Sequence, residues 1–301
     1  MTTAIASPAK TSTTKYPLTE YKSPVDPDWC PGCGDFGVLR ALQTALGELG
    51  IHPKDVLISS GIGCSSNLPG FIHAYGFHGL HGRALPVAQG AKLANPELTV
   101  IITGGDGDGY GIGAGHFLHA MRRNIDLTYI VMDNQIYGLT VGQASPTSMR
   151  GHKTKSTPWG NLEMPLNPIA LALVSGATFV ARGFSGEAKQ LAKIFEQAID
   201  HKGFALVDVF SPCVTYNKIN TYAWFKERVY KLEDRKHDAS DFKRALETAW
   251  QWGNEIPIGV FYQAEQERYE ALDVGLKQGP LVKRKLGMSN AAGKELLREF
   301  M

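Results

Sequence analysis

Short, nearly continuous hydrophobic runs alternate along the chain with stretches whose apolar residues recur at helical spacing. The runs predict buried strands, and the stretches between them predict helices. The predicted strands are Val56–Ser60, Leu98–Thr103, Leu127–Asp133, Thr178–Ala181 and Phe204–Phe210. The predicted helices are Phe36–Leu46, Val87–Leu93, Ile112–Arg122, Pro168–Val174 and Glu187–Asp200. This alternation is typical of an α/β fold with a doubly wound, mostly parallel sheet.

The two ends of the chain do not follow this alternation. Residues 1–17 are rich in Ser, Thr and Ala, and the absence of arginine and of an amphipathic pattern favours a disordered tail over a transit peptide. Residues 18–221 contain all the predicted strands and form the predicted α/β domain. Residues 222–301 are predicted to be a helical extension, because Ser240–Trp252 and Gln263–Leu272 resemble charged amphipathic helices.

Composition narrows the class of protein without identifying it. The 301 residues are 43% hydrophobic and 20% charged, which is ordinary for a soluble globular protein. With 31 basic and 29 acidic residues, the charge balance gives no reason to expect nucleic acid or an anionic membrane as partner. No apolar stretch approaches the ~20 residues of a membrane span, and no secretory signal is apparent. We therefore expect a cytoplasmic protein.

Polar residues follow two of the predicted strands at the points where ligands of parallel sheets bind. Gly105-Asp106-Gly107 ends one strand, and Asn134 comes directly after the next. A carboxylate, an amide oxygen and the backbone carbonyl of Ile136 are suitable ligands for Mg²⁺, which takes about six oxygens. The glycines allow backbone N–H groups to approach phosphate, and the following helix N-terminus favours an anion. The pattern predicts a magnesium–diphosphate site.

A lone Gly-Asp-Gly is often only a turn, with Asp106 as a helix N-cap. Its pairing with Asn134 instead resembles the thiamine-diphosphate motif, which opens with Gly-Asp-Gly and closes with Asn. A nicotinamide cofactor is disfavoured, because the first predicted strand is not followed by Gly-x-Gly-x-x-Gly and a later acidic residue.

The four cysteines fall in three loops that we expect at one edge of the sheet. Cys30 and Cys33 form a Cys-x-x-Cys turn, while Cys64 and Cys213 each follow a predicted strand. Four thiolates suit either Zn²⁺ or a [4Fe–4S] cluster. Zinc ribbons usually combine two Cys-x-x-Cys turns, so the two single cysteines beside presumed cofactor loops favour the cluster. The alternative is that Cys64 and Cys213 are simply buried.

Several motifs in the same order resemble the β subunit of 2-oxoacid:ferredoxin oxidoreductases. They are Cys-Pro-Gly-Cys-Gly at 30–34, Gly-Ile-Gly-Cys-Ser-Ser-Asn-Leu-Pro-Gly at 61–70, Gly-Gly-Asp-Gly-Asp-Gly at 104–109, Asp-Asn-Gln-Ile-Tyr-Gly-Leu-Thr at 133–140 and Ser-Pro-Cys at 211–213. The resemblance covers about residues 25–217. Together with Arg-Arg-Asn-Ile-Asp at 122–126, the residues of these motifs are most similar to those of the bacterial 2-oxoglutarate type.

The resemblance implies a thiamine-diphosphate-binding fold and a role for each matching residue. Cys30, Cys33, Cys64 and Cys213 would bind one [4Fe–4S] cluster, and Asp106, Asn134 and the Ile136 carbonyl would bind Mg²⁺. The implied contacts to thiamine diphosphate are Ile62, Gly63, Cys64, Ser65, His81, Gly105, Asp106, Gly107, Asp108, Asn134, Ile136, Gly138 and Leu139. His81 would be catalytic, donating to a developing oxyanion or moving a proton; the alternative is a loop histidine that packs against His78.

The implied reaction is the reversible, coenzyme A-dependent oxidative decarboxylation of 2-oxoglutarate to succinyl-CoA and CO₂, with reduction of ferredoxin. Three alternatives stay open: pyruvate or a range of 2-oxoacids as substrate, a non-oxidative thiamine-dependent decarboxylase or ligase with structural zinc, and an iron–sulfur electron-transfer subunit without substrate. Thiamine enzymes need a carboxylate at the aminopyrimidine ring, and the chain shows no second domain to supply it. We therefore expect an α subunit, in a heterodimer or a dimer of heterodimers.

Two positions depart from the pattern of the family. Some relatives carry lysine, tied to the substrate or to coenzyme A, where this chain has Asn67 and Val141. The substrate contacts that remain implied are Asn67, Arg83 and Leu139. The missing positive charge is expected from Arg83, Lys153, Lys155 or the partner chain.

Overall fold

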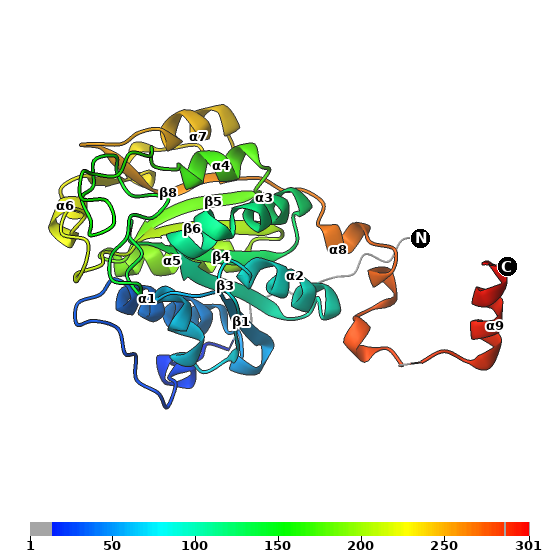
Figure 1. Ribbon diagram of the computed structural model, residues 1–301. Helices are drawn as coiled ribbons and strands as arrows, with labels where there is room; N and C mark the ends of the chain where they lie inside the picture. Colours follow the sequence, from blue (N-terminus) through cyan, green and yellow to red (C-terminus); the bar gives the residue numbers. More distant parts are fainter. Residues whose placement is uncertain (1–13, 286, 301) are drawn as a thin grey trace.

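The computed structural model describes residues 14–285 and 287–300, which fold around one eight-stranded sheet with helices on both faces (Figure 1). The spatial order of the strands is β2-β1-β3-β4-β6-β5-β8-β7. Their bounds are β1 (Val56–Ser60), β2 (Tyr75–His78), β3 (Thr99–Gly105), β4 (Leu127–Asp133), β5 (Phe179–Phe184), β6 (Phe204–Phe210), β7 (Val229–Lys231) and β8 (Ile256–Gln263).

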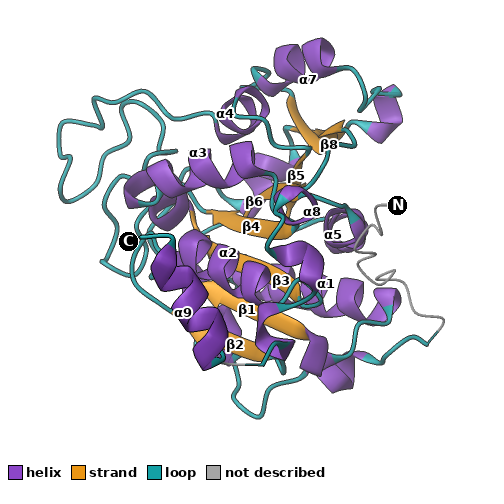
Figure 2. Cartoon of the chain, turned by 90° about the vertical axis from the view of Figure 1, so that its right-hand side faces the viewer, coloured by secondary structure: helices purple, strands orange, loops and turns teal. Residues whose placement is uncertain are grey.

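The helices form two layers, so the sheet is buried on both faces (Figure 2). α1 and α5 pack together on one face, while α2, α3 and α4 cover the other and α7 packs on α4. The helices are α1 (Asp35–Leu49), α2 (Ala84–Ala94), α3 (Ala114–Arg123), α4 (Pro168–Val174), α5 (Ala188–Asp200), α6 (Tyr222–Lys226), α7 (Phe242–Ala249), α8 (Tyr269–Leu272) and α9 (Asn290–Arg298). This arrangement explains why the central strands are continuous hydrophobic runs.

All neighbouring strands are parallel except β5 and β8, which are antiparallel. Ser60 of β1 pairs with Thr103 of β3, and Asp133 of β4 pairs with Phe210 of β6. The carboxyl ends of β1, β3, β4 and β6 therefore lie side by side at one edge. The loops that leave this edge carry most of the predicted site residues.

The predicted fold class is confirmed, but the predicted helical extension is wrong for part of its length. Ile256–Gln263 forms β8, which lies inside the sheet between β5 and β7. Pro257 and Gly259 conceal this strand in the sequence, because both residues are depleted in strand interiors. Of the helix predicted at Gln263–Leu272, only the last turn forms, as α8. The strands β2 and β7 were also not predicted.

Part of the predicted N-terminal tail is ordered. Residues 1–13 lie outside the described residues, but residues 14–17 pack beside the end of α1. The Tyr16 amide donates to the Gly47 carbonyl at 3.1 Å, and Lys15 forms an ion pair with Glu48. The expectation of disorder is therefore wrong for residues 14–17.

Beyond β8 the chain leaves the sheet and ends in α9, which stands apart from the α/β layers (Figure 1). None of the α9 residues is buried. Across the two described ranges, no helix has the length and apolar character needed to cross a membrane.

We predict that replacing Phe261 by alanine destabilises the whole fold, because its ring is fully buried in β8 and lies against the Arg182 guanidinium. Truncation of such an aromatic residue should lower the free energy of unfolding by about 3–5 kcal/mol in urea titrations. Val274→Ala is the matched control, because this side chain is 76% exposed and should change the value by less than about 0.5 kcal/mol. Equal stability of the two variants would contradict a structural role for β8.

Candidate functional site

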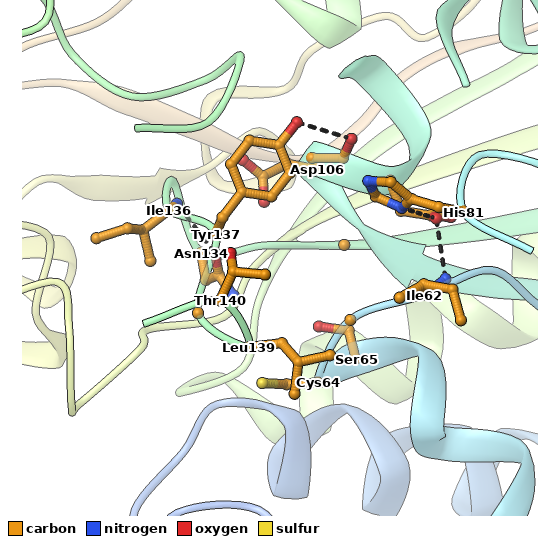
Figure 3. Close-up of a pocket in the computed structure, with 15 residues that line it drawn as sticks. Ile62, Cys64, Ser65, His81, Asp106, Asn134, Ile136, Tyr137, Leu139 and Thr140 are labelled. Carbon is orange, nitrogen blue, oxygen red and sulfur yellow. Dashed lines mark hydrogen bonds and ion pairs between the residues drawn. The ribbon is translucent and has the colours of Figure 1, made fainter. Parts of the chain in front are cut away.

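One pocket of about 160 Å³ opens at the carboxyl ends of β1, β3 and β4 (Figure 3). Every residue predicted to contact the cofactor lines this single pocket. The lining residues are Ile62, Gly63, Cys64, Ser65, His81, Gly105, Asp106, Gly107, Asp108, Asn134, Ile136, Tyr137, Gly138, Leu139 and Thr140. The fold therefore brings together loops that are up to about 80 residues apart in sequence. Tyr137 and Thr140 are the additions that sequence reasoning missed.

Asp106, at the end of β3, is buried at the floor of this pocket. Burial raises the pKa of its carboxyl to about 6, against the opposing effect of hydrogen bonds from Ser145 and Thr147. The Thr147 hydroxyl lies 2.6 Å from Asp106 Oδ2. A buried carboxylate that a hydroxyl group holds in place is a suitable ligand for a divalent cation.

Thr147 links Asp106 to a second buried carboxyl group, because its hydroxyl also lies 2.7 Å from Asp133 Oδ1. A hydroxyl has one proton and can donate to only one of the two groups. Burial, followed by the nearby carboxylates of Asp208 and Asp106, raises the pKa of Asp133 well above its ordinary value. We therefore assign the second proton to Asp133, which leaves Asp106 as the ionised member of the pair.

The loop after β4 is held by its own side chains. Asn134 Oδ1 accepts from the Ile136 amide at 3.0 Å, and the Asn134 carbonyl accepts from the Asn217 side chain at 3.0 Å. Gln135 and Val141 both have left-handed backbone conformations, with φ of 58° and 68°. A β-branched residue rarely adopts this conformation, so the loop is kept in a costly shape by its surroundings.

Tyr137, in the same loop, explains why residue 107 is glycine. The Tyr137 hydroxyl donates to the Gly107 carbonyl at 3.2 Å, and its ring lies across the backbone of that residue. A Cβ atom at position 107 would lie 2.1 Å from Tyr137 Cε1. The glycine of the Gly-Asp-Gly motif therefore serves a close approach of chain segments as well as phosphate access.

Asp108 organises two further loops rather than pointing into open solvent. It lies in a π-helical turn, Gly107–Ile112, that follows β3. Its Oδ1 accepts from the amides of Ile62 at 2.9 Å and Gly82 at 2.7 Å, and from the ring of His81 at 2.7 Å. A Cβ atom at Gly61 would meet this carboxylate at 2.1 Å. One buried side chain thus fixes the loop after β1 and the loop that carries His81.

The hydrogen bond to Asp108 also sets the tautomer of neutral His81. Because the carboxylate oxygen accepts from this ring, Nδ1 carries the proton and Nε2 keeps its lone pair. The His81 ring lines the pocket, with its centroid 6.3 Å from that of Tyr137. His78, the packing partner in the alternative prediction for His81, has its Nδ1 hydrogen-bonded to the Ser66 carbonyl at 2.8 Å.

A second cavity, of about 140 Å³, lies beside the first and is lined by all four cysteines. None of the four is in a disulfide. Within residues 14–285 and 287–300, no three His, Cys, Asp or Glu side chains stand close enough to hold a single metal ion. Cys64, Asn134, Gly138 and Leu139 line both cavities, so the two share a wall.

Two of the four thiols, those of Cys33 and Cys64, are partly removed from water, whereas Cys30 is exposed. Burial raises the pKa of Cys33 strongly and that of Cys64 to about 11, and the Asp35 carboxylate adds to both shifts. Asp35 itself is buried, and burial raises its pKa to about 6 despite hydrogen bonds from Ser211 and Ser65. Since metal ligation requires thiolates, binding at this cavity must displace protons from the cysteines.

The residues predicted to contact substrate are only partly brought together. Leu139 lines both cavities, and Asn67 lines the cysteine cavity. Arg83 lines neither, and its guanidinium donates to the Gly82 carbonyl at 3.1 Å. Lys153 and Lys155 also lie outside both linings, as does Val141. No lysine or arginine of the described residues lines either cavity.

Comparison with protein families matches most of the chain to two models. Residues 61–209 match the C-terminal thiamine pyrophosphate-binding domain of thiamine pyrophosphate enzymes. Residues 213–278 match the C-terminal region of the pyruvate ferredoxin oxidoreductase beta subunit. The first match contains every residue that lines the pocket. The second match contains β7 and β8.

Individual relatives agree with these matches. The 2-oxoacid:ferredoxin oxidoreductase subunit beta of Saccharolobus solfataricus is 54% identical over 79% of this chain and 82% of its own length. The 2-oxoglutarate oxidoreductase subunit KorB of Mycobacterium tuberculosis is 45% identical over 66% of this chain and 53% of its own. A solved 2-oxoglutarate:ferredoxin oxidoreductase from Magnetococcus marinus, with 2-oxoglutarate, coenzyme A and succinyl-CoA bound, is 40% identical, with a TM-score of 0.87 over 98% of this chain and 99% of that one.

We predict that neutral His81 is protonated at Nδ1, as its bond to Asp108 requires. Long-range ¹H–¹⁵N spectra, with His81→Gln used for assignment, should show this tautomer. Asp108→Ala should remove the preference and, by leaving two buried amides without an acceptor, lower the free energy of unfolding by about 2–4 kcal/mol. A wild-type His81 protonated at Nε2 would contradict the assigned geometry.

Proposed function

The chain belongs to the β subunits of 2-oxoacid:ferredoxin oxidoreductases, and from this membership we propose that it acts with an α subunit in the reversible, coenzyme A-dependent oxidative decarboxylation of 2-oxoglutarate. The observation that carries the proposal is the wall shared by the thiamine-type pocket and the cysteine cavity. An electron donor and an electron acceptor bound in the two cavities would be immediate neighbours.

The pocket fits a magnesium–thiamine diphosphate group. Asp106 would supply a carboxylate oxygen, Asn134 its amide oxygen and Ile136 its backbone carbonyl. Asn134 Oδ1 accepts one hydrogen bond within its loop, which leaves a second lone pair for a cation. Gly63 has φ of 131° and nothing within 4 Å of a Cβ position, so its backbone lies open toward a ligand. The buried Asp106 carboxylate and the free lone pair of Asn134 support these two residues as Mg²⁺ ligands, and the Ile136 carbonyl is the proposed third.

The cysteine cavity fits an iron–sulfur cluster better than a single zinc ion. A single Zn²⁺ would draw its sulfur ligands to ~2.3 Å from one point, whereas the described cysteines surround a cavity. A four-iron cluster is larger and takes one thiolate at each iron. Cys30, Cys33, Cys64 and Cys213 would be these ligands. A Cβ atom at Gly138 would lie 3.7 Å from the sulfurs of both Cys64 and Cys213, so the glycine keeps this wall of the cavity open.

When bound, thiamine diphosphate supplies the electron sink for decarboxylation, and an iron–sulfur cluster accepts electrons one at a time. The chain's own residues would position the bound groups and transfer protons. His81 presents Nε2 at the pocket, where it can take up a proton as a neutral ring or donate one as an imidazolium. The Asp108 carboxylate orients the ring in either state. Leu139, which lines both cavities, would contact the substrate.

The pocket is incomplete in a way that supports a partner chain. Among the described residues, Asp106 and Asp108 are the acidic ones that line it, and both are already engaged, so the carboxylate for the aminopyrimidine ring would come from the α subunit. The cation for the second carboxylate of 2-oxoglutarate would come from the same partner, since Arg83 lies outside both linings. Ferredoxin would receive the electrons, and we propose that the complex works in the cytoplasm.

We predict that two variants separate the two cofactor sites. Asp106→Ala should lose most affinity for thiamine diphosphate in the presence of Mg²⁺ but keep its iron. Cys30→Ser should lose iron but keep thiamine diphosphate, because Cys30 lines only the cysteine cavity. Calorimetric titration with thiamine diphosphate and iron and sulfide analysis check both results. Zinc instead of iron in the anaerobically purified wild type would favour the non-oxidative alternative.

We predict that the complex purified with its α subunit reduces methyl viologen when given 2-oxoglutarate and coenzyme A. The rate with pyruvate should be at least about tenfold lower in kcat/KM, a difference of ~1.4 kcal/mol in transition-state binding. Asp106→Ala in the same complex is the negative control. Comparable rates with both acids would replace the 2-oxoglutarate assignment by the broader 2-oxoacid activity. No reduction with either acid would leave an electron-transfer role only.

A further inference from the structure

Asp35 lines the cysteine cavity and contacts the loops of Cys64 and Cys213. It is the first residue of α1, two positions after Cys33, and is 1% exposed. Its Oδ2 accepts from the Ser65 hydroxyl at 3.0 Å, and its Oδ1 accepts from the Ser211 hydroxyl at 2.6 Å. Ser65 adjoins Cys64, and Ser211 precedes Cys213 by two residues. One carboxylate therefore joins all three cysteine-bearing loops.

Backbone contacts reinforce the same arrangement. The Gly34 amide donates to the Pro212 carbonyl at 3.2 Å, and the Trp29 indole donates to the Cys64 carbonyl at 2.7 Å. A Cβ atom at Gly34 would lie 2.6 Å from the Cα atom of Ser211. The Cys-x-x-Cys turn is thus pressed against the loop of Cys213 and tied to that of Cys64, which leaves Asp35 in a confined space between them.

We propose that Asp35 is a positioning residue that holds the three cysteine loops in the geometry required by the iron–sulfur cluster before the cluster is bound. This inference rests on the proposed function, because it takes the four cysteines as cluster ligands. A carboxylate removed from water must keep its hydrogen-bond donors, so Ser65 and Ser211 cannot move away from it without cost. Residues behind the ligands commonly fix ligand orientation in this way.

The competing role for Asp35 is purely structural, since an acidic residue in the first turn also stabilises a helix N-terminus. The positioning role requires the hydrogen bonds from Ser65 and Ser211, whereas stabilisation of the helix N-terminus requires only the charge of Asp35. Ser65→Ala combined with Ser211→Ala removes both bridges to the cysteine loops while the charge at the start of α1 is kept. This double variant tests positioning without touching the helix.

The test uses the full chain, reconstituted anaerobically with iron and sulfide. Wild type should take up about four irons per chain. Asp35→Ala and the double serine variant should each retain less than about a quarter of the wild-type iron. Asp35→Asn should restore most of it, because an amide oxygen accepts from one serine while its NH₂ group donates to the other. The Asp35→Asn substitution should also shift the midpoint potential of the cluster to a less negative value, since it removes a negative charge beside the cluster.

Asp126→Ala is the matched control, because Asp126 is an equally buried aspartate, paired with Lys92 at 3.2 Å, that lines neither cavity. It should lower thermal stability but keep the iron. A wild type that binds no iron would overturn the proposed function itself. With iron in the wild type, a double serine variant that keeps it, or equal loss in Asp35→Asn and Asp35→Ala, would overturn the positioning role alone. If Asp35→Ala does not fold, the iron content of the double serine variant and of Asp35→Asn tests the positioning role instead.

Discussion

A carboxylate removed from water must keep hydrogen-bond donors or an opposite charge, and at the functional edge of the sheet neighbouring loops bring the donors. Asp108 accepts from the loops of Ile62 and His81, and Asp106 is bound by Thr147. Asp35 accepts from Ser65 and from the loop after β6. Each carboxylate therefore links segments that are distant in sequence. The hydrogen bonds to these carboxyl groups hold the loops in place, and the two cavities lie between the loops.

This order has a functional consequence, because the same loops form both cavities. Asn134, Gly138 and Leu139 of the loop after β4, together with Cys64, form the wall between them. The loop contains two residues in left-handed conformations, Gln135 and Val141. A wall formed by so few residues keeps the two cavities close while separating them. The cost of its backbone conformation is offset by the hydrogen bonds of Asn134 and by packing of Tyr137 on Gly107.

The sequence was sufficient for the parts of the molecule whose signal is local. β1, β4 and β6 are mostly hydrophobic and buried, and their predicted and observed bounds are the same. β8 could not be found in this way, because Pro257 and Gly259 interrupt the run and its place in the sheet depends on β5 and β7. The Mg²⁺ ligands were predicted from glycine and aspartate motifs directly after strands, whereas the rest of the pocket lining was implied by the family resemblance.

The sequence could not show which residues become hydrogen-bond partners once the chain has folded. Asp35 stands next to the cysteines in sequence, yet its two donors are 30 and 176 residues away. Thr147 bridges Asp106 and Asp133 from a loop with no helix or strand of its own. Arg83 was placed near substrate by resemblance, but its side chain turns to the carbonyl of Gly82. In each case the deciding contact joins chain segments that no local pattern connects.

The charges around the two cavities also indicate where substrate choice must reside. Their linings contain aspartates, cysteines and His81, but within the described residues no lysine or arginine. A diphosphate brings further negative charge, which Mg²⁺ and backbone N–H groups can balance, whereas a dicarboxylic substrate would add two more. Since no described lysine or arginine lines these cavities, cations from a partner would offset this repulsion. Under the proposed function, selection among 2-oxoacids would therefore depend on the basic residues that a partner brings to the open side of the pocket.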